Sequence, residues 1–325
     1  MNKITMKNNP ASTPGSRTRA LLICAIAAAA LCAAPVALHA QLFETNFNAG
    51  TIGEYNATTG AAIDSSFITG LTTPTGLALS GSDLFVVNNG YQGSAGGGFG
   101  GIGEYTTSGV TVNATLVSGI SNASGVAVAG SDLFVTSINS GTVGEYNAIT
   151  GATINATLVS GLSNPWGVAV SGSDLFVSNG GGISEYNATT GALINATFIS
   201  GLSNPWGIVV SGPNLYVVNN TGHNGIGEYN ASTGDPINTS FIAPGNNPAF
   251  LAISGGNIFV AVANDNVINE YDATAGTTVN APLVSGLSSP QGVVVVPESA
   301  VWPLLAGGVV VLFAALRRRP PLRLN

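Results

Sequence analysis

The dipeptide Glu-Tyr recurs six times along the chain, each time inside a similar sequence unit. The spacings between successive copies are 50, 41, 40, 43 and 42 residues, and the glutamates are Glu54, Glu104, Glu145, Glu185, Glu228 and Glu270. A period of this length is typical of arrays in which one unit cannot bury its own apolar faces and must pack on its neighbours. This repeat constrains the fold more than any other feature of the sequence.

Each unit is expected to form four short strands. In the clearest copy, apolar-rich runs cover residues 167–170, 174–178, 183–187 and 193–199, and clusters of Gly, Ser, Asn, Asp and Thr separate them. Short runs rich in Val, Ile, Phe and Tyr between such turn residues indicate β-hairpins rather than helices. Four such strands form one blade of a β-propeller.

The two ends of the array are complementary. Residues 42–46 align with the second run of the clearest copy, so the first copy lacks its innermost strand, whereas residues 290–295 match only the innermost run. Three strands from the amino end and one from the carboxyl end would complete a sixth blade and remove two exposed sheet edges. We therefore expect an all-β, six-bladed propeller with such a clasp blade over residues 41–297. An open β-solenoid, the alternative, has no need of complementary ends.

The motif P-x-G-V-A-V, followed by D-L-F-V-S-N and I-x-E-Y-N-A-T-T-G, resembles the NHL-type repeat and the related six-bladed propellers of the gluconolactonase and senescence-marker group. The resemblance covers residues 41–297 and implies the propeller fold, which hosts lactonases, lyases, oxidoreductases and binding modules. Gluconolactonase-like enzymes hold a divalent metal with carboxylate and asparagine ligands, and streptogramin-lyase-like enzymes use histidines with a glutamate. The chain has only His39, in the leader, and His223, so a histidine-based site is not expected.

Residues 1–40 have the layout of a signal peptide for export. Four basic residues precede an apolar stretch at 20–36, and Leu38-His39-Ala40 offers a cleavage site. Both cysteines lie in the apolar stretch, so the mature domain is expected to have no disulfide.

Residues 298–325, together with Pro297, resemble a PEP-CTERM sorting signal. Pro297-Glu298 precedes an apolar run at 302–316, which is expected to be a helix, and the run is followed by Arg317, Arg318 and Arg319. The resemblance implies that an exosortase of a polysaccharide-producing bacterium recognises the tail, although Ser299 stands where the family has a second proline. A plain tail anchor is the alternative, with a run shorter than the roughly 20 residues of a spanning helix. Both place the propeller outside the inner membrane, in the cell envelope or at the cell surface.

All eight Lys and Arg residues lie in these two targeting segments, whereas 14 of the 15 acidic residues lie within 41–297. Binding to nucleic acid or to anionic membranes is not expected, because both rest on Lys and Arg. Cations and neutral polar ligands are the compatible partners. No cofactor is expected, with Ca²⁺ as the alternative.

The glutamates of the Glu-Tyr pairs are expected to be structural. They fall on the third strand of each blade, about 10 Å outside the channel wall, and are too far from one another to share a metal ion. We expect each to bond groups of its own or the adjacent blade. Asp83, Asp132 and Asp174, in the turn before the second strand, are expected to bond nearby backbone.

The position before the inner-strand glycine differs among the copies. It holds, in chain order, Thr75, Ser124, Trp166, Trp206, Ala249 and Gln291, and in the Ala249 copy Phe250 replaces the glycine. In this fold the position faces one mouth of the central channel. Two tryptophans on adjacent blades could stack on a sugar ring or another flat ligand while amides bond its edge. The candidate ligand-binding residues are Trp166, Trp206, Asn164, Asn204 and Gln291.

The alternative for the tryptophans is that they plug the channel or pack between blades. Further polar candidates for the channel stand near the ends of the second strands, at Asn46, Asn88, Ser137, Asn179 and Asn219. No catalytic or metal-ligating residue is assigned.

Near-identical blades suit a scaffold, whereas an active site requires blades to differ. The sequence therefore favours an exported, surface-associated propeller that is a non-catalytic binding or extracellular-matrix interaction module. Its expected partners are an exosortase and either extracellular polysaccharide or another surface protein. The alternative is a lactonase-like or lyase-like enzyme that depends on a divalent cation.

Overall fold

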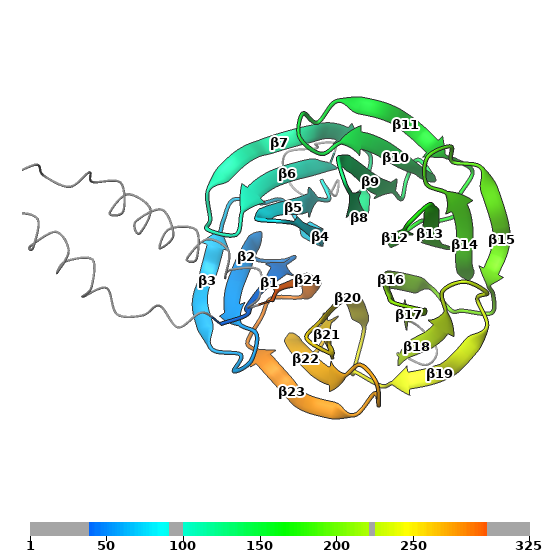
Figure 1. Ribbon diagram of the computed structural model, residues 1–325. Coiled ribbons are helices and arrows are strands. Elements are labelled where there is room, and N and C mark those ends of the chain that lie inside the picture. The colour runs from blue at the N-terminus through cyan, green and yellow to red at the C-terminus, as the bar shows by residue number, and fades with distance from the viewer. Residues whose placement is uncertain (1–38, 91–99, 221–224, 298–325) are drawn as a thin grey trace, which may run out of the picture. The chain divides into compact units, whose positions relative to one another are not determined.

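The computed structural model describes residues 39–90, 100–220 and 225–297. These residues form six four-stranded antiparallel sheets arranged around a central channel (Figure 1). The predicted six-bladed propeller is thereby confirmed. In the clearest copy, each observed strand differs from its predicted run by at most one residue at either end. The predicted tail, and all of the predicted leader except residues 39 and 40, lie outside the described residues.

We number the blades in chain order and give the strands of each from the channel outward. Blade 1 contains β24 (Pro290–Val296), β1 (Gln41–Asn46), β2 (Thr51–Asn56) and β3 (Ala62–Ile68). Blade 2 contains β4 (Pro74–Ser80), β5 (Asp83–Asn88), β6 (Gly100–Thr106) and β7 (Thr111–Ile120). Blade 3 contains β8 (Ala123–Ala129), β9 (Asp132–Ser137), β10 (Thr142–Asn147) and β11 (Thr153–Val159).

The second half of the ring repeats this layout. Blade 4 contains β12 (Val168–Ser171), β13 (Asp174–Asn179), β14 (Gly182–Asn187) and β15 (Leu193–Ile199). Blade 5 contains β16 (Pro205–Ser211), β17 (Asn214–Asn219), β18 (Gly225–Asn230) and β19 (Pro236–Ile242). Blade 6 contains β20 (Pro248–Ser254), β21 (Asn257–Val262), β22 (Val267–Asp272) and β23 (Thr278–Ser285).

Blade 1 is the predicted clasp, in which the last strand pairs with the first. β24 lies antiparallel to β1 with Phe43 opposite Val294, and the register shifts between Glu44 and Asn46. The Ser288 N–H donates to Asn46 Oδ1 at 2.7 Å, and the Gly292 N–H donates to Thr45 Oγ1 at 2.7 Å. The clasp thus joins the two ends of the domain by a strand ladder and by side-chain hydrogen bonds.

One hydrophobic cluster fills each of the six boundaries between blades. The second strand of a blade is buried on both faces, because a neighbouring blade covers each side, and its sequence therefore has no polar alternation. In β13, for example, Leu175 and Phe176 point to opposite faces and both are buried. The outer strand is largely exposed in its first part: β11, for example, is exposed along its first five residues and buried at its last two, Leu158 and Val159.

Neighbouring inner strands approach closely where they carry glycine. A Cβ added at Gly125 would lie 2.5 Å from the carbonyl oxygen of Trp166 in blade 4, so no larger side chain fits without a shift. A hydroxyl group on the second strand bridges the same contact: Thr136 Oγ1 accepts the Gly125 N–H at 2.8 Å and donates to the Trp166 carbonyl at 2.8 Å. Thr45 and Ser178 make the equivalent bridges from blades 1 and 4.

Candidate functional site

The two tryptophans singled out in the sequence lie against each other. Trp166 stands two residues before β12 and Trp206 lies on β16. Their rings stack with centroids 4.3 Å apart and planes inclined by 16°. Both side chains are partly buried. Trp206 also packs against the hydrophobic cluster between blades 5 and 6. Because the stack occupies one face of each ring, the pair cannot hold a ligand between its members. Trp166 packs in none of the six clusters, so its second ring face is the candidate surface for a ligand.

Two polar atoms in this layer are buried without a hydrogen-bond partner in the part of the chain that the structure describes. They are Trp206 Nε1 and the hydroxyl oxygen of Ser124, which occupies the equivalent position in blade 3. Native proteins satisfy most buried polar atoms, so each exception is a marker of a site that can accept a water or a ligand group. Ser124 lies in the blade next to that of Trp166, on the side away from Trp206.

Asn164 and Asn204 have a backbone role. Both adopt left-handed conformations, with φ of 50° and 53°, and each directly precedes a proline, Pro165 or Pro205. The equivalent residues of the other four blades share this conformation, and they are Thr73, Asn122, Asn247 and Ser289. Asparagine tolerates positive φ better than most residues, which accounts for its use here.

Gln291 lies away from the tryptophan pair. It is on β24 of blade 1, which is a neighbour of blades 2 and 6 and not of blades 4 and 5. Its side chain is buried, and Nε2 donates to the Ser289 hydroxyl at 3.4 Å. The structure therefore brings Trp166 and Trp206 together but does not bring Gln291 to them.

The polar residues near the ends of the second strands bond mainly to loops. The side-chain oxygens of Asn46, Asn88 and Asn219 accept N–H groups of the segment that leads into the inner strand. Ser137 Oγ donates to a carbonyl of the same segment in blade 3, and Asn179 bonds Ser184 instead. None of these residues is among those that line the described channel cavity. Sequence position placed them near the channel end of the blade, but the adjacent loop takes their hydrogen bonds.

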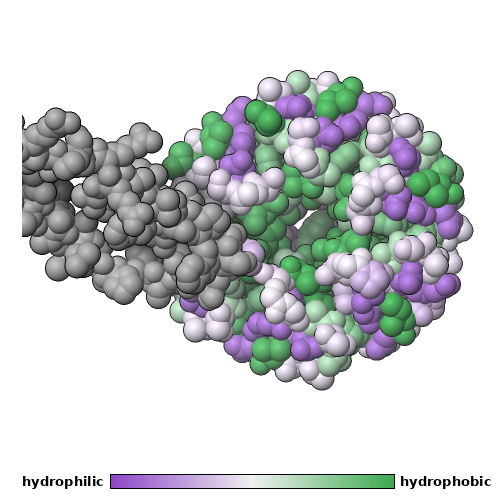
Figure 2. Space-filling view, viewed as in Figure 1, coloured by the Kyte–Doolittle hydropathy of each residue, from purple (hydrophilic) through white to green (hydrophobic). Residues whose placement is uncertain are grey.

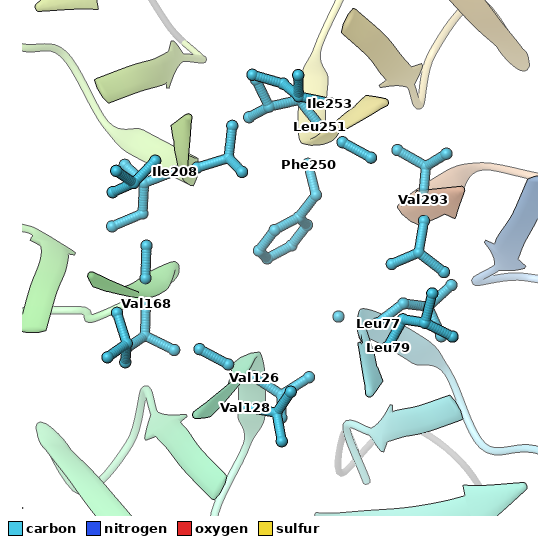
Figure 3. Close-up of a pocket in the computed structure, with 18 of the residues that line it drawn as sticks. Leu77, Leu79, Val126, Val128, Val168, Ile208, Phe250, Leu251, Ile253 and Val293 are labelled. Carbon is cyan, nitrogen blue, oxygen red and sulfur yellow. The ribbon is translucent and has the colours of Figure 1, made fainter. Parts of the chain in front are cut away.

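The side chains that line the channel are hydrocarbons, whereas the backbone of the inner strands makes much of its accessible surface polar. The channel contains a partly open cavity of about 300 Å³, to which all six inner strands contribute (Figure 3). The ring includes Leu77, Val126, Val168, Ile208, Leu251 and Val293. Phe250 of β20 projects from one side into the opening. Viewed from one end of the propeller, the hollow at the centre is bordered largely by hydrophobic residues (Figure 2).

The glutamates of the Glu-Tyr pairs have the local partners that the sequence predicts in three blades. Gln41, Asn214 and Asn257 each donate a side-chain amide N–H to the glutamate of their blade, at 2.6, 2.7 and 2.7 Å. The partner stands at the start of the second strand, diagonally across from the glutamate on the third. These contacts fix the glutamates inside single blades and away from a shared centre.

In blades 2, 3 and 4 an aspartate occupies the position of that amide. Asp83, Asp132 and Asp174 each lie near the glutamate of their own blade and raise its pKa, in addition to the larger effect of burial. Ser131 and Ser173 donate hydroxyl hydrogen bonds to Asp132 and Asp174, so these two aspartates bond a neighbouring side chain rather than the backbone groups that the sequence predicts. The pairing of two carboxyl groups was missed, although comparison of the copies at this position could have found it.

Glu44 is a further buried carboxyl group, and it departs from the repeat pattern. It lies on β1 with no exposed surface, and burial raises its pKa to about 8. Asn46 Nδ2 donates to Oε1 at 2.6 Å, whereas Oε2 has no hydrogen-bond partner among the described residues. The equivalent residue in every other blade is valine, at Val86, Val135, Val177, Val217 and Val260. The signal was present in the sequence as one charged residue at a position otherwise held by valine.

Within the ranges 39–90, 100–220 and 225–297, no group of three His, Cys, Asp or Glu side chains could hold a metal ion. No helix among these residues is long and apolar enough to cross a membrane.

No family model matches the sequence, and no curated protein matches it. Many solved structures resemble the fold, and two of them are described here. A chain in the crystal structure of a nidogen–laminin complex aligns with a TM-score of 0.63 and 13% identity over 80% of this chain and 99% of its own. A functionally unknown protein from Desulfotomaculum acetoxidans aligns with a TM-score of 0.56 and 14% identity over 79% of this chain and 99% of its own. At these identities the likeness concerns the propeller fold alone.

Proposed function

We propose that the chain is an exported, surface-associated propeller that acts as a non-catalytic binding or extracellular-matrix interaction module. The observation that carries this proposal is the contrast between constant and variable positions. The blades share their strand pattern, their packed boundaries and their aliphatic channel wall, whereas the layer before the inner-strand glycine differs from blade to blade and contains the stacked Trp166 and Trp206. The fold is also compatible with a binding role, since it occurs in a nidogen–laminin complex.

The proposed ligand site is the free face of Trp166. A flat, weakly polar ring such as that of a sugar would stack there, with its edge toward the small Ser124 of the next blade. The unsatisfied Ser124 hydroxyl and Trp206 Nε1 are the nearby groups that a ligand or a bridging water would pair with. A neutral ligand such as a polysaccharide suits a domain that has 14 acidic residues and no Lys or Arg between residues 41 and 297.

Export and surface attachment rest on the sequence of the two ends. The leader at 1–40 supports export, and the tail, with Pro297, Glu298, Arg317, Arg318 and Arg319, supports recognition by an exosortase-type sorting enzyme. A direct test is expression with and without an exosortase, followed by the intact mass of the product. Loss of the segment after Pro297 only when the enzyme is present would support the proposal, and an unchanged mass would oppose it.

The binding site is tested with a glycan array. We expect the wild-type protein to bind a subset of neutral polysaccharides and Trp166→Ala to lose that binding. Trp166→Phe should keep part of it because a flat ring remains. Ile149→Ala, at a residue 76% exposed on another part of blade 3, is the matched control and should bind as the wild type does. Identical profiles for wild type and Trp166→Ala would overturn the proposed site.

The enzymatic alternative needs a cation held by oxygen ligands in the channel. The side chains that line the channel cavity are hydrocarbons, so among the groups at the described cavity only backbone carbonyl oxygens could offer such ligands. Melting with and without a chelator, together with a lactone-hydrolysis assay, separates the two functions. Calcium-dependent stabilisation accompanied by turnover would favour the enzyme over the binding module.

A further inference from the structure

A groove lies between the outer strands of blades 4 and 5. It has a volume of about 550 Å³, which is within the range of small-molecule sites, and it is half open to solvent. Its walls are the end of β15 with the segment that follows, and the first part of β19. The two blades meet closely here, because a Cβ added at Gly234 would lie 2.1 Å from the carbonyl oxygen of Phe198.

Hydroxyl groups make up most of the polar side chains of this groove. The polar side chains that line it are Thr197, Ser200, Asn219, Tyr229, Thr239 and Ser240. Within the part of the chain that the structure describes, the fold uses none of the four Ser and Thr hydroxyl groups in a hydrogen bond, since Thr197 and Ser240 bond through their backbone N–H instead. All four residues are exposed, so their hydroxyl groups are available to a ligand.

Apolar residues also line the groove, but they are mostly covered. Phe198, Ile199 and Tyr229 belong to the hydrophobic cluster between blades 4 and 5, and each is at most 6% exposed. The accessible surface of the groove is therefore more polar than apolar. A few apolar contacts beside several hydroxyl groups match a sugar, whose ring carbons are apolar and whose edges carry hydroxyl groups.

The groove differs from the equivalent region of the other blades at Thr239. The equivalent residues in the other blades are Ser65, Ala114, Ala156, Ala196 and Ala281. Four of the five other blades thus fold with alanine at this position, so the strand does not need a hydroxyl group there. The outer strand of blade 5 offers one hydroxyl group more than those four strands do.

The charges of the domain restrict what can bind. No charged side chain lines the described groove, so a cationic ligand would find no carboxylate there to pair with. An anionic ligand would meet the field of a domain that has 14 acidic residues and no Lys or Arg between residues 41 and 297. A neutral ligand rich in hydroxyl groups fits both conditions.

We propose that this groove is a saccharide subsite, in which Ser200, Thr239 and Ser240 bond a short segment of a neutral polysaccharide. The inference rests on the proposed function, because it supplies a second contact for the same class of ligand. Two weak subsites on one polymer reinforce each other, since the first contact holds the polymer at a high effective concentration near the second. The groove therefore raises the affinity for a polymer more than the affinity for a fragment.

NMR on the full, ¹⁵N-labelled chain locates the binding of short fragments. The probes are cellotetraose and maltotetraose, with the acidic tetragalacturonate as the control. We expect a neutral probe to shift the backbone amides of residues 197–202 and 239–240, and tetragalacturonate to leave them unchanged. Failure of both neutral probes to shift these amides would overturn the groove as a subsite. Shifts confined to the Trp166 indole would also overturn it, but they would leave the proposed binding function intact.

Variants on two blades separate the groove from the site at Trp166. Thr239→Ala, which gives blade 5 the residue of four other blades, should weaken the binding of the neutral fragment about two- to tenfold, the effect of one hydrogen bond. Thr239→Phe should fill the groove and abolish binding, whereas Ala156→Phe, at the equivalent exposed position of blade 3, should leave it unchanged. Wild-type affinity in Thr239→Phe would place the fragment elsewhere. Trp166→Ala should keep the groove shifts whatever its effect on the glycan array, and their loss would show that they arise from the Trp166 site.

Discussion

The hydroxyl oxygen of Ser178 lies 2.7 Å from the carbonyl oxygen of Trp206 in the neighbouring blade, to which it donates, and 2.7 Å from the backbone nitrogen of Gly167 in its own blade, from which it accepts. One side chain therefore joins two blades at their closest approach. Both partner groups are backbone groups that would lose a hydrogen bond together if the hydroxyl were removed.

We expect Ser178→Ala to lower the free energy of unfolding by about 1–3 kcal/mol, because it leaves a buried donor and a buried acceptor without their partner. Ser178→Thr should be close to wild type, since Thr136 makes the same bridge from blade 3. Urea unfolding measures both variants. Equal midpoints for wild type and Ser178→Ala would show that the bridge contributes nothing.

The tryptophan stack should contribute measurably to the free energy of unfolding as well as to ligand binding. Trp206→Ala is expected to cost about 3–5 kcal/mol because its ring also packs in the cluster between blades 5 and 6. Trp166→Phe should cost less than Trp166→Ala, because it keeps an aromatic contact of the kind worth about 0.5–1.5 kcal/mol. Thermal melting of the three variants checks this order. A milder effect of Trp206→Ala than of Trp166→Ala would contradict the packing that we describe.

Glu44 should make the fold less stable as pH rises. Its carboxyl group titrates near pH 4.5 in the unfolded chain and near pH 8 in the folded protein, so between these values the unfolded state releases a proton that the folded state retains. Stability from this group is complete below about pH 4.5, declines toward about pH 8 by roughly 5 kcal/mol, and is constant above it. The nearby Tyr55, with a pKa raised to about 12, does not titrate in this window.

Glu44→Gln is the matched variant, because the amide oxygen can still accept from Asn46 while the ionisable proton is removed. We expect the difference in urea midpoint between wild type and Glu44→Gln to grow from pH 5 to pH 8. Other glutamates with raised pKa act in the same direction, so the comparison of the two proteins is the readout. Parallel pH profiles would contradict a buried, protonated Glu44.

The aspartate–glutamate pairs can be tested by exchanging aspartate and asparagine at equivalent positions of different blades. Asp174→Asn should let an amide donate to Glu185 as Asn257 does to Glu270, and it should stabilise the protein by about 1 kcal/mol at pH 7. Asn257→Asp should have the opposite effect. Both differences should shrink at pH 4, because burial raises the pKa of Glu185 and of Glu270, so these glutamates lose charge as the pH falls to that value. Denaturation at the two pH values tests this, and an Asp174→Asn variant less stable than wild type at pH 7 would oppose it.

The fold was predictable because each blade repeats the same sequence pattern of short apolar runs between turn residues. The run Asp174 to Asn179 reads as a strand between turn residues, and its lack of polar alternation is explained by the blades that cover both faces. The clasp followed from the alignment of the two ends, and the pairing of β1 with β24 confirms it.

The candidate site was less predictable, because a repeat places a residue in a layer without giving the direction of its side chain. The stacking of Trp166 on Trp206 depends on how two blades are inclined to each other, which the period does not specify. Asn164 was expected to bond a ligand, yet its left-handed backbone conformation already explains the residue. Glu44 was not singled out, because a strand is recognised from its apolar residues and one charged residue does not change that pattern.

The clasp also sets the order in which this protein can fold. The hydrogen bonds that join Ser288 to Asn46 and Gly292 to Thr45 span 242 and 247 residues of chain, almost the whole length of the propeller. Such long-range closure is slow because the loop entropy is lost before the contacts form. A chain that emerges from its amino end therefore keeps the inner edge of β1 unpaired until β24 arrives, so the ring forms as a finished unit only after nearly every blade is present.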